Sequence, residues 1–435
     1  MTLKKIFSIR KELAWVVFGQ FLAFSGGIVG IKVLTNMMGP EHYGQLALGL
    51  TIAGLVNLFV FGPIGQAITR FFSICRENGQ LSFYFATGRR IIVLASIVLV
   101  AVLLISVTAC YVIFGQQWAI LTACALIFGY ATGINSSFIS LQNAIRQRRI
   151  VALHQGMDMW LRMLLAIVAM MLWGESGSVA LLGFCIGLLL IILSQYYFAF
   201  QDWQISEYFM ADSTQNINTS YVYRDFSNYA RSFLYFSAFG AIALYADRWI
   251  LQGLYGEREV GIYAALYLIA NTPVTVLMGL AGQLLLPIIY DQAGDMRCPE
   301  KMERSQKTVR LTVLIFSVCM MLLVLITYLF SEPIVILLSN DEFGRFASSL
   351  WVILAGICLF QLGQLLVMQG LAQARPNIYI IPKLIHAFIF LILTFWLARQ
   401  YGIQGVGMSL CISSFVYLLL ILFANFRLKR EIDAL

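Results

Sequence analysis

Residues 34–66 read LTNMMGPEHYGQLALGLTIAGLVNLFVFGPIGQ, and residues 251–283 read LQGLYGEREVGIYAALYLIANTPVTVLMGLAGQ. A shift of 217 positions, close to half of the 435 residues, superposes the two stretches. The matches fall mainly on small residues: Gly39, Gly44, Ala47, Ile52, Ala53, Gly62, Gly65 and Gln66 align with Gly256, Gly261, Ala264, Ile269, Ala270, Gly279, Gly282 and Gln283. We interpret this as an internal duplication, in which each half of the chain builds the same fold.

The composition indicates a membrane environment. Hydrophobic residues make up 60% of the chain and charged residues only 11%. The apolar runs are long enough to cross a bilayer about 30 Å thick. We therefore interpret the chain as a polytopic membrane protein, and we expect its first span to act as its own signal.

Apolar stretches between polar breaks predict about twelve transmembrane helices. They cover residues 13–34, 44–69, 91–114, 118–141, 152–173, 179–200, 229–254, 260–290, 309–330, 348–372, 377–398 and 402–424. The eighth span contains Pro273 and Pro287, which predict a kink rather than one straight rod. Its counterpart, the second span, contains Pro63.

The basic residues predict the orientation, because lysine and arginine are retained on the cytoplasmic side of a membrane. With a cytoplasmic N-terminus, all but six of the 29 lysines and arginines fall on that side. The six are Lys32, Arg162, Arg248, Arg258, Arg345 and Arg399. We expect a multi-pass protein of the cytoplasmic membrane with both termini in the cytoplasm, and this bias explains the net charge of +8 without nucleic acid.

The two repeats should run in the same direction. Six spans form an even number, so the second copy enters the membrane as the first does, which makes the repeats parallel. We expect an all-α fold of two six-helix bundles with pseudo-two-fold symmetry around a central cavity. Residues 1–200 would form the N-terminal bundle, 201–228 a cytoplasmic polar linker, 229–424 the C-terminal bundle and 425–435 a cytoplasmic tail.

Motifs of enzymes and cofactor sites are absent from the sequence. It contains no Gly-x-x-x-x-Gly-Lys-Ser/Thr loop, no His-Glu-x-x-His and no Gly-x-Ser-x-Gly. The three histidines, His42, His154 and His386, are too dispersed to predict a metal site. We expect no catalytic residues, no cofactor and no metal.

Ionisable residues inside the spans are the functional candidates, because each costs about 2.5–3.5 kcal/mol at the bilayer centre. In the fifth span, His154, Asp158 and Arg162 are spaced i, i+4 and i+8, so they share one helix face. A rise of about 1.5 Å per residue puts Arg162 near the midplane. Two interpretations stay open: Asp158 and Arg162 neutralise each other as a buried pair, or Arg162 is a cavity-facing cation that Asp158 tunes.

Other candidates lie in the first, seventh and eleventh spans. Asp247 and Arg248 are adjacent, so their side chains should leave the helix about 100° apart and only one would face a cavity. Like them, Lys32 is expected near the external rim, where a long side chain reaches water. Lys383 and His386 enter the membrane from the cytoplasmic side, and His386 is either a group that changes charge near neutral pH or a hydrogen-bonded structural residue.

These residues include more cations than anions, which suits a phosphate-bearing or otherwise anionic substrate. The candidate substrate-binding residues are Arg162, Arg248, Lys32 and Lys383. The candidates for coupling or charge tuning are Asp158, Asp247, His154 and His386.

Two regions of the sequence resemble a known family. GQFLAFSGGIVG at residues 19–30 and LTNMMGPEHYG at residues 34–44 resemble the start of polysaccharide transporters, which carry Leu-Thr-x-x-Leu-Gly-Pro-Glu-x-Tyr-Gly after the first span. Met38 replaces the usual leucine. DRWILQ at 247–252 and EVGIYAA at 259–265 are similar to the mid-chain motif of that family. The chain thus resembles lipid-linked oligosaccharide flippases of the O-antigen type, in the multidrug/oligosaccharidyl-lipid/polysaccharide exporter superfamily.

The resemblance implies that the protein moves a polyprenyl-diphosphate-linked oligosaccharide across the cytoplasmic (inner) membrane by alternating access. The product would be the O-antigen of lipopolysaccharide, a capsule or an exopolysaccharide. The basic candidates would hold the diphosphate or acidic sugars, while Asp158 or Asp247 would take part in H⁺ or Na⁺ coupling. Membrane lipids are expected partners, and a polysaccharide polymerase and chain-length machinery are candidate partners.

Two other functions stay open. A cation-coupled multidrug exporter of the same superfamily would share the fold but should favour acidic cavity residues, and the excess of intramembrane cations argues against it. A membrane-bound polysaccharide polymerase or ligase usually needs a large external loop. The longest external segment predicted here is only Ser331–Ala347.

Overall fold

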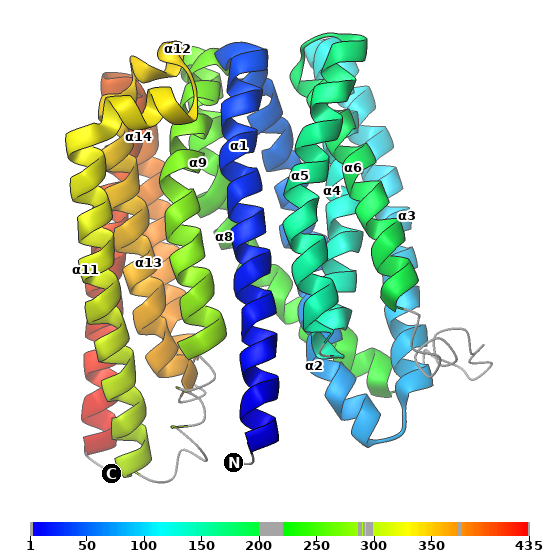
Figure 1. Cartoon of the computed structure of the whole chain (residues 1–435), viewed down its shortest axis with the longest axis vertical. Helices are drawn as coiled ribbons and strands as arrows, with labels where there is room; N and C mark the ends of the chain where they lie inside the picture. The colour runs from blue at the N-terminus through cyan, green and yellow to red at the C-terminus, as the bar shows by residue number, and fades with distance from the viewer. Residues whose placement is uncertain are drawn as a thin grey trace. The chain divides into compact units, whose positions relative to one another are not determined.

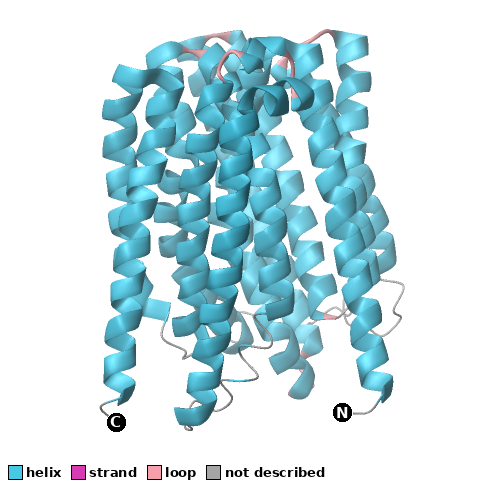
Figure 2. Cartoon of the chain, turned by 60° about the vertical axis from the view of Figure 1, so that its left-hand side comes forward, coloured by secondary structure: helices cyan, strands magenta, loops and turns pink. Residues whose placement is uncertain are grey.

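The computed structural model describes residues 3–145, 147–199, 221–285, 299–372 and 376–433, together with residues 289 and 292. Over these ranges the regular elements are helices, joined by short loops (Figure 2). The prediction of an all-α fold is confirmed.

The chain divides into two compact units, which we call the N-unit (residues 1–30 and 37–241) and the C-unit (residues 31–36 and 242–435). The N-unit contains most of α1 (Leu3–Val56), η1 (Asn57–Phe61), α2 (Gly62–Glu77), α3 (Leu81–Phe114), α4 (Gln116–Ala144), α5 (Arg148–Trp173), α6 (Gly177–Ala199) and the first part of α8 (Tyr221–Tyr255). The C-unit contains the rest of α8, α9 (Glu257–Leu280), η3 (Ala281–Leu285), α11 (Pro299–Leu338), α12 (Asp341–Gly344), η4 (Ala347–Ser349), α13 (Leu350–Ala372), η5 (Pro376–Tyr379) and α14 (Ile380–Asp433).

The helices match the twelve predicted spans. Nine helical segments of the described chain are long and apolar enough to cross a membrane. Two of them hold two predicted spans each, because Gly39 interrupts Ala14–Glu77 and Gly402 interrupts Asn377–Leu428. Helix α8 corresponds to the predicted seventh span. The chain is therefore a multi-pass membrane protein.

Each unit is built around its fourth span. In the N-unit, α4 packs against α2, α3 and α6, and in the C-unit, α13 packs against α9, α11 and α14 (Figure 1). Helix α4 is the fourth predicted span of the first repeat, and α13 is the fourth of the second. The same helix order thus surrounds the same central position in both halves, as the duplication predicts.

The duplicated glycines also share their backbone conformation. Gly39 has φ 64° and ψ 172°, and Gly256 has φ 91° and ψ −171°. Each lies where one helix ends and the next begins. Glycine alone enters this region of backbone space freely, because it has no Cβ. The sequence match at 39 and 256 therefore marks the same sharp corner in both halves.

In the sequence, a proline follows each of the two π-helices of the described chain. In η1 the Gly62 N–H donates to the carbonyl oxygen of Asn57, five residues earlier, and the element ends two residues before Pro63. Pro287 stands at the same distance after η3 in the sequence, although it lies outside the described residues. Proline has no N–H and its ring crowds the preceding turn, so the helix widens before it. The eighth span was predicted to be kinked, and its helix changes from α to π after Leu280. Pro273 lies inside α9, which continues past it.

Parts of the predicted linker and of the predicted tail are helical. Residues 221–228, predicted as the end of the linker, form the first turns of α8, because Val222 and Phe226 are buried in the apolar cluster that contains Phe72 and Tyr84. Linker residues 201–220 lie outside the described chain. The first part of the predicted tail, residues 425–433, continues α14.

Candidate functional site

The charged cluster of the N-unit consists of Asp158 and Arg162, one turn apart on α5. The Arg162 Nε atom donates to Asp158 Oδ1 at 2.6 Å, and Arg162 Nη2 pairs with Asp158 Oδ2. The guanidinium carbon lies 5.5 Å from the centre of the Phe128 ring on α4. The Asp158 side chain is 8% exposed, whereas the Arg162 side chain is 18% exposed. The carboxylate is therefore neutralised, and part of the arginine stays accessible.

A glycine on α6 allows the close packing of this region. A Cβ at Gly187 would lie 3.0 Å from the backbone of Arg162. Such a distance is shorter than ordinary van der Waals contact, so any larger residue would push α6 away from α5. Gly187 thereby sets how closely α6 covers the helix that carries the ion pair.

His154 lies two turns before Arg162 but is not part of the pair. Its Nδ1 atom is 2.7 Å from the Ile150 carbonyl oxygen, and its Nε2 atom is 2.9 Å from Ser194 Oγ on α6. Both ring nitrogens are thus used within the N-unit. This arrangement joins α5 to α6 and matches the role of a hydrogen-bonded structural histidine.

The charged cluster of the C-unit combines Asp247 and Arg248 of α8 with Tyr263 and Tyr267 of α9. Asp247, only 2% exposed, accepts a hydrogen bond from the Tyr263 hydroxyl at 2.5 Å. The Arg248 guanidinium carbon lies 4.9 Å from the centre of the Tyr267 ring and 5.9 Å from that of Tyr263. Two tyrosines one turn apart on α9 thus cover both charges.

Asp247 and Arg248 meet although their side chains leave the helix in different directions. Arg248 Nη1 lies 3.4 Å from Asp247 Oδ1 and donates to the Leu244 carbonyl oxygen at 3.0 Å. The long arginine side chain folds back along its own helix, which sequence spacing alone did not predict. The carboxylate and the guanidinium therefore form one cluster rather than two separate candidates.

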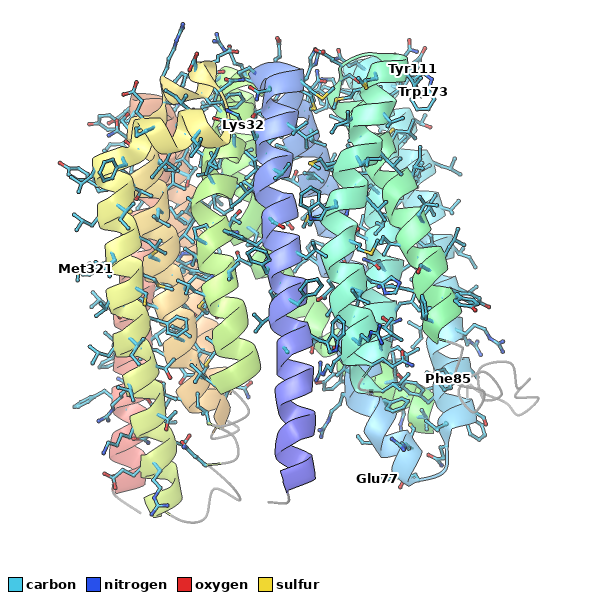
Figure 3. The ribbon with its side chains drawn as sticks, viewed as in Figure 1. Lys32, Glu77, Phe85, Tyr111, Trp173 and Met321 are labelled. Atoms are coloured by element: carbon cyan, nitrogen blue, oxygen red, sulfur yellow. The ribbon has the colours of Figure 1, made fainter. Side chains whose placement is uncertain are left out.

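Lys32 binds the end of a helix. Its Nζ atom donates to the carbonyl oxygens of Ile336 at 2.8 Å and Ser339 at 2.6 Å, where α11 ends. Figure 3 shows Lys32 close to this end of the C-unit. A cation at a helix C-terminus compensates carbonyls without a partner in the helix and the negative end of the helix dipole.

Lys383 and His386 lie near the beginning of α14. Lys383 is half-buried, and His386 is 3% exposed. The His386 ring packs against Phe360, Phe390 and Tyr417, and its Nε2 atom has no hydrogen-bond partner among the described residues. The imidazole is thus a member of an aromatic core cluster. The structure brings neither residue into the Asp247–Arg248 cluster.

Sequence reasoning missed the two tyrosines of the C-unit and a polar group at η1. Asn57 Nδ2 donates to Thr132 Oγ1 at 3.0 Å, and Ser136 Oγ donates to Asn57 Oδ1 at 3.4 Å. Pro63 was the available signal, because π-helices are frequent at functional sites. For the tyrosines the signal was Tyr263 itself, which lies within the EVGIYAA motif.

Comparisons with known proteins place the chain among proteins of polysaccharide synthesis. The family described as polysaccharide biosynthesis protein matches residues 9–292. The capsular polysaccharide biosynthesis protein CapF of Staphylococcus aureus is 24% identical over 233 residues, which are 53% of this chain and 57% of that protein. This chain thus spans just over half the length of that curated relative.

Two solved structures share the fold. The lipid II flippase MurJ, in an inward closed conformation, matches with a TM-score of 0.71 and 15% identity over 95% of this chain and 87% of that one. A multidrug resistance MATE family transporter of the MOP superfamily, in an inward-facing conformation, matches with a TM-score of 0.64 and 14% identity over 96% and 94%. The chain therefore has the two-bundle fold found among these transporters.

Proposed function

Because the chain belongs to the family of polysaccharide biosynthesis proteins, we propose that it is a flippase for a polyprenyl-diphosphate-linked oligosaccharide. It moves this substrate across the cytoplasmic membrane by alternating access, for the synthesis of O-antigen, capsule or exopolysaccharide. The name of the CapF relative supports a capsule-like product, and the fold shared with a lipid II flippase supports a lipid-linked substrate. The protein acts as a transporter and not as an enzyme.

The observation that carries the proposal is an arginine held within a spanning helix of each unit. Arg162 uses Nε and Nη2 for Asp158, which is one edge of a planar group with five N–H donors. The other edge is suited to a phosphate oxygen, which arginine binds by charge-assisted hydrogen bonds. Arg162 and Arg248 are therefore the proposed diphosphate ligands. We assign Lys32 to the end of α11 and keep Lys383 as a predicted contact for acidic sugars.

The Asp247 cluster suggests how transport couples to an ion. Asp247 accepts from Tyr263 and pairs with Arg248, so a proton that binds to Asp247 removes the negative charge of this pair. The Arg248 guanidinium would then be free to bind the anionic substrate. Protonation of Asp158 would free Arg162 in the same way. Na⁺ bound at either carboxylate would also neutralise its charge and free the arginine. His154 and His386 are weaker coupling candidates, because both are held in packed structural settings.

The alternative functions have less support. A cationic drug would compete for Asp158 and Asp247, which already have an arginine partner each. A polymerase or ligase would need an external catalytic segment. The described segment between Ser331 and Ala347 consists largely of the end of α11 and the short helix α12.

The test is flipping of a fluorescent polyprenyl-diphosphate oligosaccharide in proteoliposomes. We expect flipping by the wild type and its loss in Arg162→Ala, with Arg399→Ala as a control that removes an arginine elsewhere. An imposed H⁺ or Na⁺ gradient should accelerate wild-type flipping and have less effect on Asp247→Asn.

A second variant separates function from folding. Asp158→Asn combined with Arg162→Gln replaces the ion pair by two neutral amides, so no buried charge is left alone. If this variant folds and flips the substrate as fast as the wild type, Arg162 is not a diphosphate ligand. If the wild type does not flip the glycan made by its own host, the proposed function is wrong.

A further inference from the structure

A cavity in the N-unit lies apart from the Asp158–Arg162 pair. It has a volume of about 220 Å³ and is formed between α2, α3 and α4. Its walls include Ile68, Tyr84, Gly88, Ile134 and Leu141. Figure 3 labels the neighbouring wall residue Phe85 near one end of α3 and Tyr111 near the other.

Both hydroxyl groups in the wall are hydrogen-bonded to backbone carbonyls of the protein. The Tyr84 hydroxyl donates to the Ile68 carbonyl oxygen at 2.9 Å, and Ser137 Oγ donates to the Gly133 carbonyl oxygen at 3.0 Å. The remaining wall is formed mostly by aliphatic and aromatic carbon. A cavity of this kind binds hydrocarbon rather than a sugar, because it offers few groups to replace the hydrogen bonds that a sugar makes with water.

The cavity lies beside surface that the bilayer covers. Helix α3 is apolar along most of its length but largely exposed in the isolated chain, as at Val93, Ile97 and Ile105. Val93 also belongs to the cavity wall. Exposed apolar surface on a spanning helix faces lipid chains, so hydrocarbon is the medium next to the cavity.

An arginine lies at the cavity where lipid phosphates are found. Residues 91–114 of α3 are 24 residues without a charge and span about 36 Å as a helix, enough for the hydrocarbon core. Arg89 and Arg90, directly before this run, therefore lie at the level of the headgroups. Arg89 is exposed and lines the cavity, and the Arg90 guanidinium lies 5.4 Å from the centre of the Tyr223 ring.

We propose that this cavity is a binding site for an anionic membrane phospholipid, with one acyl chain between α2, α3 and α4 and the phosphate at Arg89. Arg89 supplies a positive charge at the headgroup level, and the wall residues Ile92 and Val93, which follow it on α3, supply apolar surface on its membrane side, so the site offers a contact for both parts of such a lipid. The site is independent of the proposed transport function.

Gly88 offers a way to close the cavity without disturbing the helix. A Cβ at Gly88 would meet no atom within 4 Å, so the side chain in Gly88→Leu would extend into open space. Gly253 in α8 is equally open and serves as the matched control, Gly253→Leu. Arg89→Gln removes the headgroup contact, with Arg399→Gln as the control for loss of charge elsewhere.

The experiment is native mass spectrometry of the full chain in detergent with dioleoylphosphatidylglycerol, dioleoylphosphatidylcholine or undecaprenyl phosphate. We expect phosphatidylglycerol to bind more tightly than phosphatidylcholine, with one site lost in Gly88→Leu. Arg89→Gln should weaken binding about fivefold, the contribution of one basic residue near an anionic lipid surface. The control variants should bind like the wild type.

Three results would overturn the proposal. Equal phosphatidylglycerol binding by the wild type, Gly88→Leu and Arg89→Gln would show that the cavity is not the site. Equal affinity for phosphatidylcholine would remove the role of the headgroup charge. Tighter binding of undecaprenyl phosphate, lost in Gly88→Leu, would assign the cavity to an isoprenoid chain. Thermal unfolding without added lipid checks that each variant is folded.

Discussion

The two halves of this protein share a backbone plan but hold their buried charges in different ways. In the N-unit, Asp158 and Arg162 satisfy each other on one helix, and an aromatic ring from a second helix only flanks them. In the C-unit, Asp247 depends on Tyr263 of α9 as well as on Arg248. The duplication thus preserved the framework, while the chemistry of each half diverged.

The largest effect should come from removing the more deeply buried carboxylate. Asp247→Asn leaves Arg248 without its anion, and loss of one partner of a buried pair costs about 3–5 kcal/mol in free energy of unfolding. Asp158→Asn should cost less, about 1–3 kcal/mol, because the Asp158 side chain is 8% exposed against 3% for Asp247, and that of Arg162 is 18% exposed against 13% for Arg248. Equilibrium unfolding in a single detergent measures both values. Equal losses would mean that the two clusters are energetically alike.

A second change at the C-unit cluster isolates its charge. Arg248→Met in the Asp247→Asn background removes the unpaired cation while keeping an apolar side chain of similar length. We expect it to recover part of the lost stability, because no buried charge remains. A further loss in the double variant would mean that Arg248 stabilises the unit by packing on the tyrosines.

The repeated corners should respond alike in both halves. Gly39→Ala and Gly256→Ala force a Cβ into a backbone region that costs about 1–3 kcal/mol. No atom lies within 4 Å of the position that either Cβ would take, so strain of the backbone is the whole effect. Gly27→Ala and Gly253→Ala, which are equally open at ordinary φ, are the controls. If the unfolding midpoint fell in only one of these two variants, the two corners would not be equivalent.

The tyrosine hydroxyl tests the dependence of the C-unit on α9. Tyr263→Phe removes a donor to a buried carboxylate and should cost about 1–3 kcal/mol. Tyr267→Phe keeps the ring face that Arg248 covers, so this change should lower the free energy of unfolding by less than about 0.5 kcal/mol. The same unfolding measurement compares the two. If Tyr267→Phe lowered the free energy of unfolding as much as Tyr263→Phe, the hydrogen bond from the Tyr263 hydroxyl to Asp247 would not be the stabilising feature.

A small effect is also expected at the aromatic neighbour of the N-unit pair. Phe128→Leu keeps an apolar side chain but removes the ring beneath Arg162, which should cost about 0.5–1 kcal/mol beyond lost packing. The same change made in an Arg162→Met background measures the packing loss alone, and the difference between the two backgrounds is the interaction of the ring with the guanidinium. No difference between the two backgrounds would mean that the ring and the guanidinium do not interact.

Much of the fold could be predicted because its signals are local. Apolar runs predicted the spans, and the alignment of residues 34–66 with 251–283 predicted that the halves repeat, since both signals can be read along the chain. The pairing of Asp158 with Arg162 was also within reach, because a separation of four residues places both on one helix face. The capping role of Lys32 was not, because its acceptors lie about 300 residues later in the chain.

By itself, the sequence determined that this chain crosses the membrane many times and that its halves repeat. The length of an apolar run and the recurrence of aligned small residues are properties of the sequence itself, so they need no knowledge of which helices pack together. Only the tertiary structure decided that Tyr263 binds Asp247, that Lys32 binds the end of α11, and that α2, α3 and α4 leave an apolar cavity with Arg89 in its wall. These features depend on which helix faces lie against one another. The same pattern of apolar spans is compatible with several ways of packing the helices.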